Sequence, residues 1–288
     1  MKLGSVEHKE VFCRSFMESY REYEPEYLPW PELDNTALSL LRSIPFWEKA
    51  MDMEREAGAL VSAYAATVSD PVLQEAIALQ GKEESRHARL LNTLVNRYGI
   101  EIQERPPVQI PQNIEPAFTS FGFGECLDSF FAFGLFAIAR EAGIFPEQIF
   151  TIFDPILDEE ARHIVFFVNW FTYMQVHCGQ GFLPLRGVKT LWHYSKALST
   201  LVATFGNSDS DGTGFTATSA GVFTQDLTLE KFFTVCLQEN KHRMSKYDPR
   251  LLQPQLIPRL SNIALRTLQL IPKRKVQVRD WGLGTGDW

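Results

Sequence analysis

The sequence predicts an all-α protein built on an antiparallel bundle of four long helices, with further helices after the bundle. Three observations indicate this fold. No segment of the 288 residues shows the alternation of apolar and polar residues that is typical of a half-buried strand. Stretches of helix-forming residues are separated by prolines and glycines. One pattern, Glu-Glu-X-Arg-His, occurs twice, in "KEESRHARLL" at 82–91 and in "DEEARHIVFF" at 158–167.

Composition and charge narrow the class of protein. A chain of 288 residues that is 45% hydrophobic can bury a substantial core, as one large domain or as a domain with an appendage. Its net charge of −7 argues against a non-specific nucleic-acid binder, because such a protein needs a basic face. The short basic run at 272–279 is interpreted as a solvated surface segment. The four cysteines are far apart, which argues against a zinc knuckle or a disulfide framework.

Neither a secretion signal nor an integral membrane span is predicted. The N-terminus, "MKLGSVEHKEVF", lacks the apolar core of a signal peptide, so a cytoplasmic protein is expected. The longest strongly apolar run, at 129–139, is shorter than the roughly 20 residues that cross a bilayer. The uncharged stretch at 164–185 contains Asn, Gln and His side chains and two glycines, which also argues against a span.

The chain divides into three predicted regions. Residues 1–44 form an N-terminal extension, and prolines among its first 35 residues argue against long regular elements there. The bundle is predicted at 45–178, and its helices at 45–69, 71–98, 116–143 and 146–178. Residues 179–288 form a C-terminal helical region packed on the bundle, with a flexible loop near 207–221.

Caps and prolines set the limits of the predicted helices. Asp70 is a good N-cap and Pro71 suits the first turn, so the second helix starts there. The proline-rich link at 104–116 is too long for a tight hairpin and predicts a crossover between two halves. Pro155 lies inside the fourth helical pattern, where it predicts either a kink or a new helix capped by Asp154.

The repeated pattern predicts a metal site. Residues three apart on a helix lie on one face, so Glu84 and His87 can bind a common centre, as can Glu160 and His163. Apolar residues surround these carboxylates on the same helix faces, where an unpaired charge is costly. Two divalent cations would neutralise four such carboxylates.

A further glutamate precedes each copy of the pattern at a matching depth. Glu54 follows its helix-starting proline by nine residues, and Glu125 does the same in the second half. Glu56 is an alternative to Glu54, although its face looks solvated. Glu141 is an alternative to Glu125, but it lies at a helix end, at the wrong depth for an antiparallel hairpin. Asp128, one turn from Glu125, is a candidate hydrogen-bond partner of the ligands.

The doubled arrangement resembles the ferritin-like di-iron carboxylate superfamily, in which two helices each provide a Glu and two each provide Glu-X-X-His. The resemblance covers about residues 40–178. It implies two iron ions, or one manganese and one iron, with O2 as co-substrate. The ligands that it implies are Glu54, Glu84, His87, Glu125, Glu160 and His163. The glutamates of the two Glu-X-X-His motifs would bridge the ions, and the remaining Glu and His of each half would complete one metal.

The function implied by the resemblance is that of a di-iron oxidase or oxygenase. The Phe-rich third and fourth helices are interpreted mostly as core, with a substrate tunnel as the alternative. A Phe-rich wall with an opening at Pro155 would favour a small apolar organic substrate, and the reaction would need an electron donor. An iron- or peroxide-handling protein of the ferritin or rubrerythrin type is the alternative, as is a metal-binding scaffold without activity. Over a hundred residues beyond the bundle and the lack of Cys-X-X-Cys argue against the iron-handling alternative. A homodimer remains open.

Some polar residues of the same types are predicted to have no part in the site. Glu239 and His242 repeat the Glu-X-X-His spacing among Lys and Arg residues, which is typical of a solvated surface pair. Arg86 and Arg162 are expected to pair with neighbouring acids or to face solvent.

Overall fold

The computed structural model describes residues 1–44, 46–103, 105–143, 145–177, 179, 183–206 and 227–270. Within these ranges it contains nine α-helices, one short 3₁₀ helix and no strand, which confirms the predicted all-α class. The predicted loop at 207–221 and the basic run at 272–279 lie outside the described residues. So do Pro45 and Cys178, the ends of the predicted bundle.

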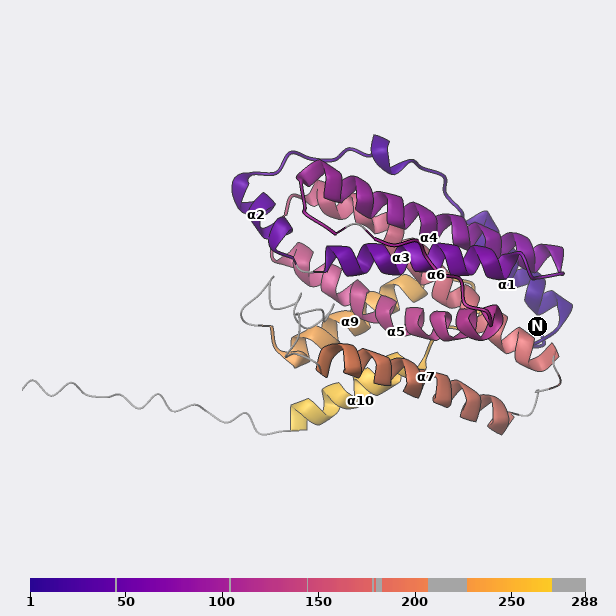
Figure 1. Ribbon diagram of the computed structural model, residues 1–288. Coiled ribbons are helices and arrows are strands. Elements are labelled where there is room, and N and C mark those ends of the chain that lie inside the picture. Colours follow the sequence, from indigo (N-terminus) through magenta and orange to yellow (C-terminus); the bar gives the residue numbers. More distant parts are fainter. Residues whose placement is uncertain are drawn as a thin grey trace, which may run out of the picture.

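Four long helices form the centre of the molecule. They are α3 (Trp47–Ala65), α4 (Pro71–Tyr98), α5 (Ile114–Glu141) and α6 (Glu147–His177). α3 packs on α4 and α5 packs on α6, while α3 also contacts α5 and α4 also contacts α6. The long link between α4 and α5 runs back along these helices, so that α4 and α5 point in the same direction (Figure 1). This is the predicted crossover between two halves.

Capping residues in the sequence determine where α4 begins and where it ends. The side chain of Asp70 accepts hydrogen bonds from the backbone N–H groups of Val72 and Leu73, and Pro71 occupies the first turn. Gly99 ends the helix at a φ of 58°, a left-handed conformation that glycine adopts without steric cost. The observed bounds match the predicted 71–98.

α6 continues as one helix through Pro155, so the prediction of a new helix capped by Asp154 is wrong. The carboxylate of Asp154 instead accepts a hydrogen bond from Arg140 of α5 at 2.8 Å. Buried apolar residues lie on both sides of the proline, and their packing maintains the helix where Pro155 itself offers no N–H.

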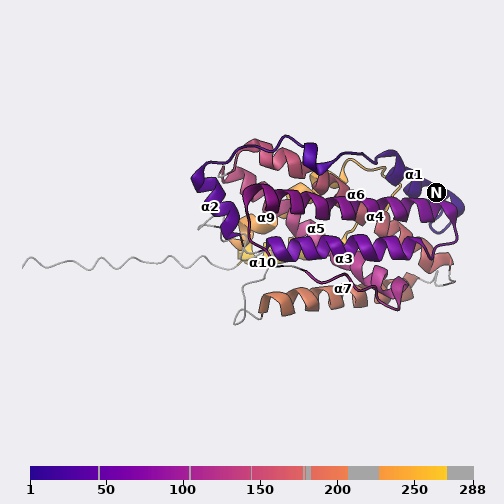
Figure 2. The same cartoon turned by 45° about the horizontal axis from the view of Figure 1, so that its top comes forward.

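The N-terminal extension is more regular than predicted. α1 (Val6–Glu18) is a helix of 13 residues that packs on α6 and α4, with Phe12, Cys13 and Phe16 fully buried. The prediction is wrong because the first proline, Pro25, comes after this helix and cannot interrupt it. The chain then passes through η1 (Pro25–Tyr27), along the outside of α4, to α2 (Asn35–Ser43) (Figure 1 and Figure 2).

Of the described C-terminal helices, two pack on α5 and the third packs mainly on the second of them. They are α7 (Leu183–Gly206), α9 (Leu229–Met244) and α10 (Leu256–Leu270), and each of them contacts α5. Among the described helices, α5 alone is long and apolar enough, by length and composition, to cross a membrane. Neighbours on several sides account for this composition, since a helix that is apolar all round is typical of a core helix. The prediction of no membrane span stays a prediction.

The buried apolar side chains form two clusters, and a polar layer separates them along the long helices. On α4, one cluster contains Leu73, Ala76 and Ile77, and the other begins at Leu90. On α3, Met51 belongs to the second cluster and Val61 to the first. Both copies of the Glu-Glu-X-Arg-His pattern and the preceding Glu54 therefore lie where the two apolar clusters meet.

Candidate metal centre

Four side chains from three helices converge in the polar layer. Glu54 of α3, Glu84 and His87 of α4, and Glu160 of α6 offer ligand atoms that all lie within 4.8 Å of one another. The Nδ1 atom of His87 lies 3.2 Å from Oε1 of Glu160 and 3.4 Å from Oε2 of Glu54. Because this is a compact, largely buried set of carboxylates and an imidazole, it could bind a metal ion.

The second half of the predicted set adjoins the first. The Nδ1 atom of His163 lies 3.1 Å from Oε1 of Glu84 and 3.7 Å from Oε2 of Glu160. Glu125 of α5 is half-buried and shares a hydrogen bond with Glu160. Glu84 and Glu160 therefore lie between the two histidines, in the position that bridging ligands would occupy.

Close packing of α3 on α4 brings Glu54 to the other ligands. A Cβ atom added at Gly58 would lie 2.6 Å from Oγ of Ser85, and one added at Gly81 would lie 2.5 Å from Oγ of Ser62. Each glycine thus faces a serine of the neighbouring helix, and the absence of a side chain lets the two backbones approach. A larger residue at either position would move Glu54 away from His87.

Unsatisfied polar atoms within the cluster fit a bound cation. Nδ1 of His87, Nδ1 of His163 and Oε2 of Glu160 are buried and have no hydrogen-bond partner of acceptable geometry. Buried polar atoms are usually hydrogen-bonded, so three unpartnered atoms that face one another fit the ligands of a bound cation. Imidazole nitrogens and carboxylate oxygens are donors that suit iron, manganese and zinc ions.

A second pair of glutamates holds the histidines from the outer side. The Nε2–H of His87 donates to Oε2 of Glu159 at 2.7 Å, and the Nε2–H of His163 donates to Oε2 of Glu83 at 2.9 Å. Each contact joins α4 to α6, so the two copies of the motif hold each other. These bonds leave both Nδ1 atoms unprotonated when the imidazoles are neutral, as metal ligation requires.

Two arginines pair with these outer glutamates. We call Glu83, Glu159, Arg86 and Arg162 the outer layer of the site. Arg86 donates to Oε1 of Glu159 at 2.7 Å, and Arg162 donates to Oε1 of Glu83. All four side chains are buried, so each charge is paired with its opposite. The prediction that the arginines pair with neighbouring acids is confirmed, and the alternative of a solvent-facing position is wrong.

Glu83 and Glu159 themselves were not among the predicted site residues. The signal was present, since both copies of the motif contain two consecutive glutamates. Consecutive helical residues point about 100° apart, so one glutamate of each pair faces the centre and the other faces the opposite helix.

The N-terminal extension covers the outer layer. The guanidinium of Arg86 lies 4.1 Å from the ring centroid of Tyr23, and that of Arg162 lies 4.9 Å from the ring centroid of Phe16. Arg162 also donates to the backbone carbonyl of Ser19. Cation–π contacts of this kind stabilise a partly desolvated guanidinium.

The electrostatics of the metal-free cluster divide the four carboxyl groups into two classes. Burial raises the pKa of Glu54 to about 7, and burial together with the charges of Glu160 and Glu84 raises the pKa of Glu125 well above its usual range. For Glu84 and Glu160 burial acts in the same direction, but contacts with the histidines outweigh it and lower both pKa values.

The two histidines show the complementary shift. Burial alone would lower their pKa values, yet the surrounding carboxylates outweigh it and raise the pKa of both His87 and His163 well above 6.5. These opposite shifts favour imidazolium forms of the histidines next to ionised Glu84 and Glu160. Protons thus offset the carboxylate charge that bound cations would otherwise offset.

The alternative ligands lie elsewhere. Glu56 is exposed on α3, and Glu141 is exposed at the end of α5, where it pairs with Lys231 at 3.0 Å. His242 is exposed on α9, while Glu239 lies 4.0 Å from Arg243. Glu54, by contrast, belongs to the converging group, and the choice of Glu125 over Glu141 as a ligand stays a prediction.

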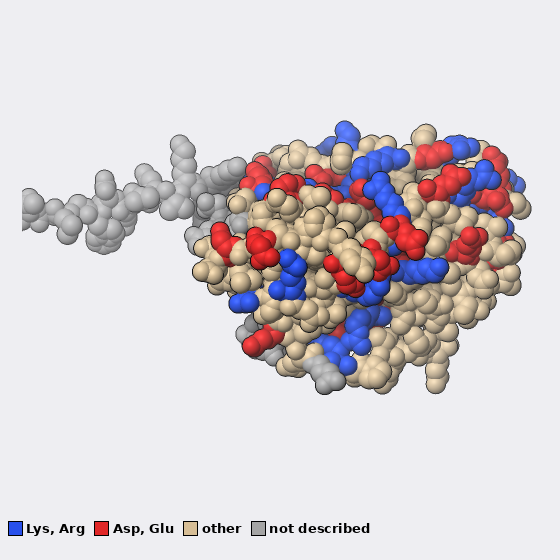
Figure 3. Space-filling model, turned by 90° about the horizontal axis from the view of Figure 1, so that it is seen from above, with Lys and Arg blue, Asp and Glu red and all other residues tan. Residues whose placement is uncertain are grey.

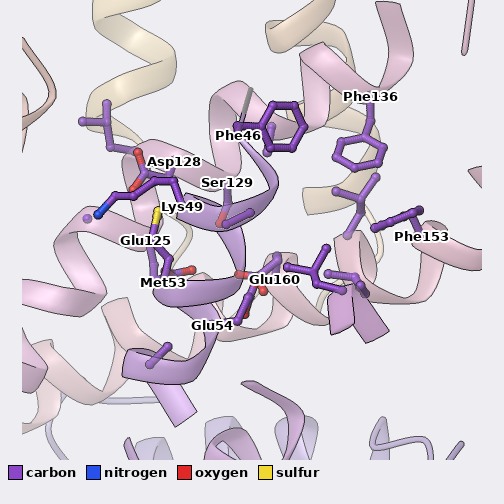
Figure 4. A pocket seen from close by; sticks show the side chains of 18 of the residues that line it. Phe46, Lys49, Met53, Glu54, Glu125, Asp128, Ser129, Phe136, Phe153 and Glu160 are labelled. Atoms are coloured by element: carbon purple, nitrogen blue, oxygen red, sulfur yellow. The ribbon is translucent and has the colours of Figure 1, made fainter. Parts of the chain in front are cut away.

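A cavity of about 360 Å³ opens beside the carboxylates, between α3, α5, α6 and α7. Figure 4 shows Glu54, Glu125 and Glu160 on its wall, with Phe46, Phe136 and Phe153 farther along. Further apolar lining residues are Trp47, Leu91, Ile156 and Leu157. This volume lies in the range of small-molecule pockets, roughly 300–1,000 Å³.

The positions of Asp128 and Pro155 relative to this cavity differ from the predicted ones. Asp128 lines the cavity near Lys49, and burial raises its pKa to about 6, but no direct hydrogen bond from it to a predicted ligand is found among the described residues. Pro155 does not border this cavity and lies instead in a more polar depression lined by Arg162 and Asp158. The expected opening at Pro155 is therefore wrong.

Replacing Glu83 or Glu159 by Gln should weaken metal binding roughly 10- to 100-fold, the usual effect of losing a carboxylate that orients a ligating histidine. An amide keeps the shape but does not stabilise the imidazole charge in the same way. The measurement is a titration with Mn(II), made at a temperature where the metal-free variant is folded. Glu75→Gln, at an exposed position of α4, is the matched control and should bind as the unmodified protein does. Unchanged affinity in both outer-layer variants would contradict this role.

Comparison with known proteins adds no family. The chain matches no protein-family model, no curated protein and no solved structure. What the geometry establishes is a helical protein with a buried cluster of Glu54, Glu84, His87 and Glu160 that could bind a metal ion.

Proposed function

We propose that the protein is a ferritin-like dinuclear metal oxidoreductase that uses O2 to oxidise a small apolar organic molecule. The single observation that carries this proposal is the buried set of four glutamates and two histidines, supplied by α3 to α6, beside an apolar cavity. The long crossover between α4 and α5 supports a ferritin-like bundle, in which one such connection is usual.

The donor set fits two divalent ions. Glu54 and His87 would hold one ion, Glu125 and His163 would hold the other, and Glu84 and Glu160 would bridge them. Four carboxylates balance four positive charges, which makes the loaded cluster neutral. Two iron ions, or one manganese and one iron, would supply the electrons and open coordination positions that O2 reduction requires.

The protein's own residues would prepare this chemistry in three ways. Glu83 and Glu159 fix the histidine rings and keep Nδ1 facing the centre. The apolar wall formed by residues such as Phe136 and Phe153 excludes water from the region next to Glu160. Asp128 and Lys49, on the same wall, are placed to bind a polar end of the substrate or to pass protons from solvent.

Metal analysis of protein expressed with iron and manganese tests the proposal. We expect two ions per chain, and a change in the optical spectrum when O2 is added to the anaerobically reduced protein. His87→Ala and His163→Ala should each lose at least one ion while remaining folded, because the apolar clusters on either side stay intact. Two ions retained in both variants would contradict the ligand assignment.

Measurements of assembly mass and of O2 consumption, combined with the metal analysis, distinguish the other functions. A mass measurement that gives a large hollow cage, with many iron ions per chain, would favour iron storage. A protein that binds metal but consumes no O2 with any added organic compound would favour the metal-binding scaffold. A chain of low oligomeric state with two ions, and O2 consumption that depends on an added organic compound, supports the oxidoreductase.

A further inference from the structure

Two C-terminal helices present apolar side chains to solvent. These exposed residues are Val188, Leu191 and Trp192 on α7, and Leu260, Ile263 and Leu270 on α10. On α7, Leu191 and Trp192 follow Val188 by three and four residues. On α10, Ile263 and Leu270 follow Leu260 by three and ten residues. These spacings place the residues on one side of each helix. The opposite side of α7 packs on α5, where Tyr194 and His193 contact the ring of Phe123. Each helix therefore has a buried side and an exposed apolar stripe, which we call together the α7–α10 face.

The charge of these two helices differs from that of the whole protein. Acidic residues make up 35 of the 288 residues, about one in eight, so the 39 residues of the two helices would carry about five on average. They carry none, but contain five basic residues: Arg186, Lys189, Lys196, Arg259 and Arg266. Arg259 and Arg266 are exposed next to the apolar stripe of α10. Arg259 directly precedes Leu260, and Arg266 lies between Ile263 and Leu270 in the sequence.

The two helices lie on the same side of the molecule. In Figure 1 both run beneath α5, on the side away from α4, and both contact α5. The upper face, seen in Figure 3, has a different character, because Lys and Arg alternate there with Asp and Glu. A protein with a net charge of −7 thus has two helices on one side that combine exposed apolar residues with basic residues and contain no acidic residue.

We propose that the α7–α10 face docks on a membrane surface that contains anionic lipids. A helix with Trp and Leu on its outer side and basic residues beside them is typical of helices that lie in the headgroup region of a bilayer. Each Lys or Arg close to such a surface contributes to the attraction, and Trp192 would anchor at the interface. The helices lie on the membrane in this arrangement and do not cross it.

Charge favours a lipid surface over a second copy of the chain. A two-fold symmetric dimer through this face would bring basic residues of one copy towards basic residues of the other. Anionic headgroups would instead neutralise the same residues. An apolar substrate would also be available there, because Lys196 and Ala197 of α7 form part of the cavity wall. The docking itself does not depend on a bound metal.

Co-sedimentation with lipid vesicles tests the proposal on the full-length, metal-stripped protein. We expect it to bind vesicles of phosphatidylcholine mixed with phosphatidylglycerol at least tenfold more tightly than vesicles of phosphatidylcholine alone. Arg259→Gln with Arg266→Gln should weaken the binding about 30-fold, from about 1 kcal/mol for each basic residue at an anionic surface. Leu191→Gln with Trp192→Gln removes apolar contact without changing charge, and should weaken binding at least tenfold.

The control variant is Tyr27→Gln, which changes an exposed aromatic residue on η1 that is outside this face. It should bind vesicles as the unmodified protein does, and circular dichroism should show all variants folded. No preference for anionic vesicles, or equal binding by the α7 and control variants, would overturn the proposal. So would a dimer in sedimentation velocity that Leu191→Gln with Trp192→Gln converts to a monomer, because the face would then be occupied by a second copy.

Discussion

Stripping metal from the protein at neutral pH should lower its melting temperature by roughly 10 °C. Binding to the folded state alone stabilises it by about 4 kcal/mol when free metal is a thousandfold above the dissociation constant. For a domain of this size each kcal/mol shifts the melting temperature by roughly 2–4 °C. The measurement is a pair of anaerobic thermal melts, with and without added Fe(II).

Replacing Glu84 and Glu160 together by Gln should remove most of this metal-dependent difference, because amides do not neutralise or bridge two cations. Glu56→Gln with Glu141→Gln is the matched control. It removes the same two charges from exposed positions of α3 and α5 and should keep the full difference. If the unmodified protein melts identically with metal confirmed present and absent, these carboxylates are not the metal site.

The difference in melting temperature between the metal-loaded and metal-free protein should widen between pH 6 and pH 8. In the metal-free protein, the raised pKa values of Glu54, Glu125, His87 and His163 mean that the folded state binds protons more tightly than the unfolded state. The stability that they contribute is present at low pH and is lost as the pH rises through the folded pKa values, which for Glu54 is about 7. Bound metal replaces the protons, so the loaded protein should not show this loss.

Loading both metal positions at pH 7 should release protons, because the raised pKa values of His87, His163 and Glu125 make these groups hold protons more tightly than usual. Glu54, whose pKa is about 7, should contribute about half a proton. The overall binding constant for two ions should therefore rise with pH near neutrality.

Calorimetric titration with Mn(II) in buffers of different ionisation enthalpy measures the number of protons released. Mn(II) is suitable because it is stable in air under these conditions. The Glu56→Gln and Glu141→Gln control should release the same number as the unmodified protein. A heat of binding that is the same in all buffers would show that no protons leave, and would contradict the charge balance described for the metal-free cluster.

Local rules were enough to predict much of this protein. The Asp70-Pro71 cap and the glycine at 99 predicted α4 to the residue, because capping depends on side chains within one turn. The spacing of Glu84 and His87 placed both on one helix face for the same local reason. The doubling of the motif predicted that the two faces meet, and Glu54, Glu84, His87 and Glu160 do converge in the structure, with His163 3.1 Å from Glu84.

Tertiary structure decided which partners those residues have. The pairing of His87 with Glu159, and of His163 with Glu83, joins residues more than seventy positions apart, and no local pattern specifies it. The continuity of α6 through Pro155 and the burial of α1 also depend on packing between helices. Local propensity is a weak preference that tertiary contacts override. The residue types and their spacing were therefore set by the sequence itself, whereas the outer carboxylate layer, the cavity and the α7–α10 face follow from how the helices pack.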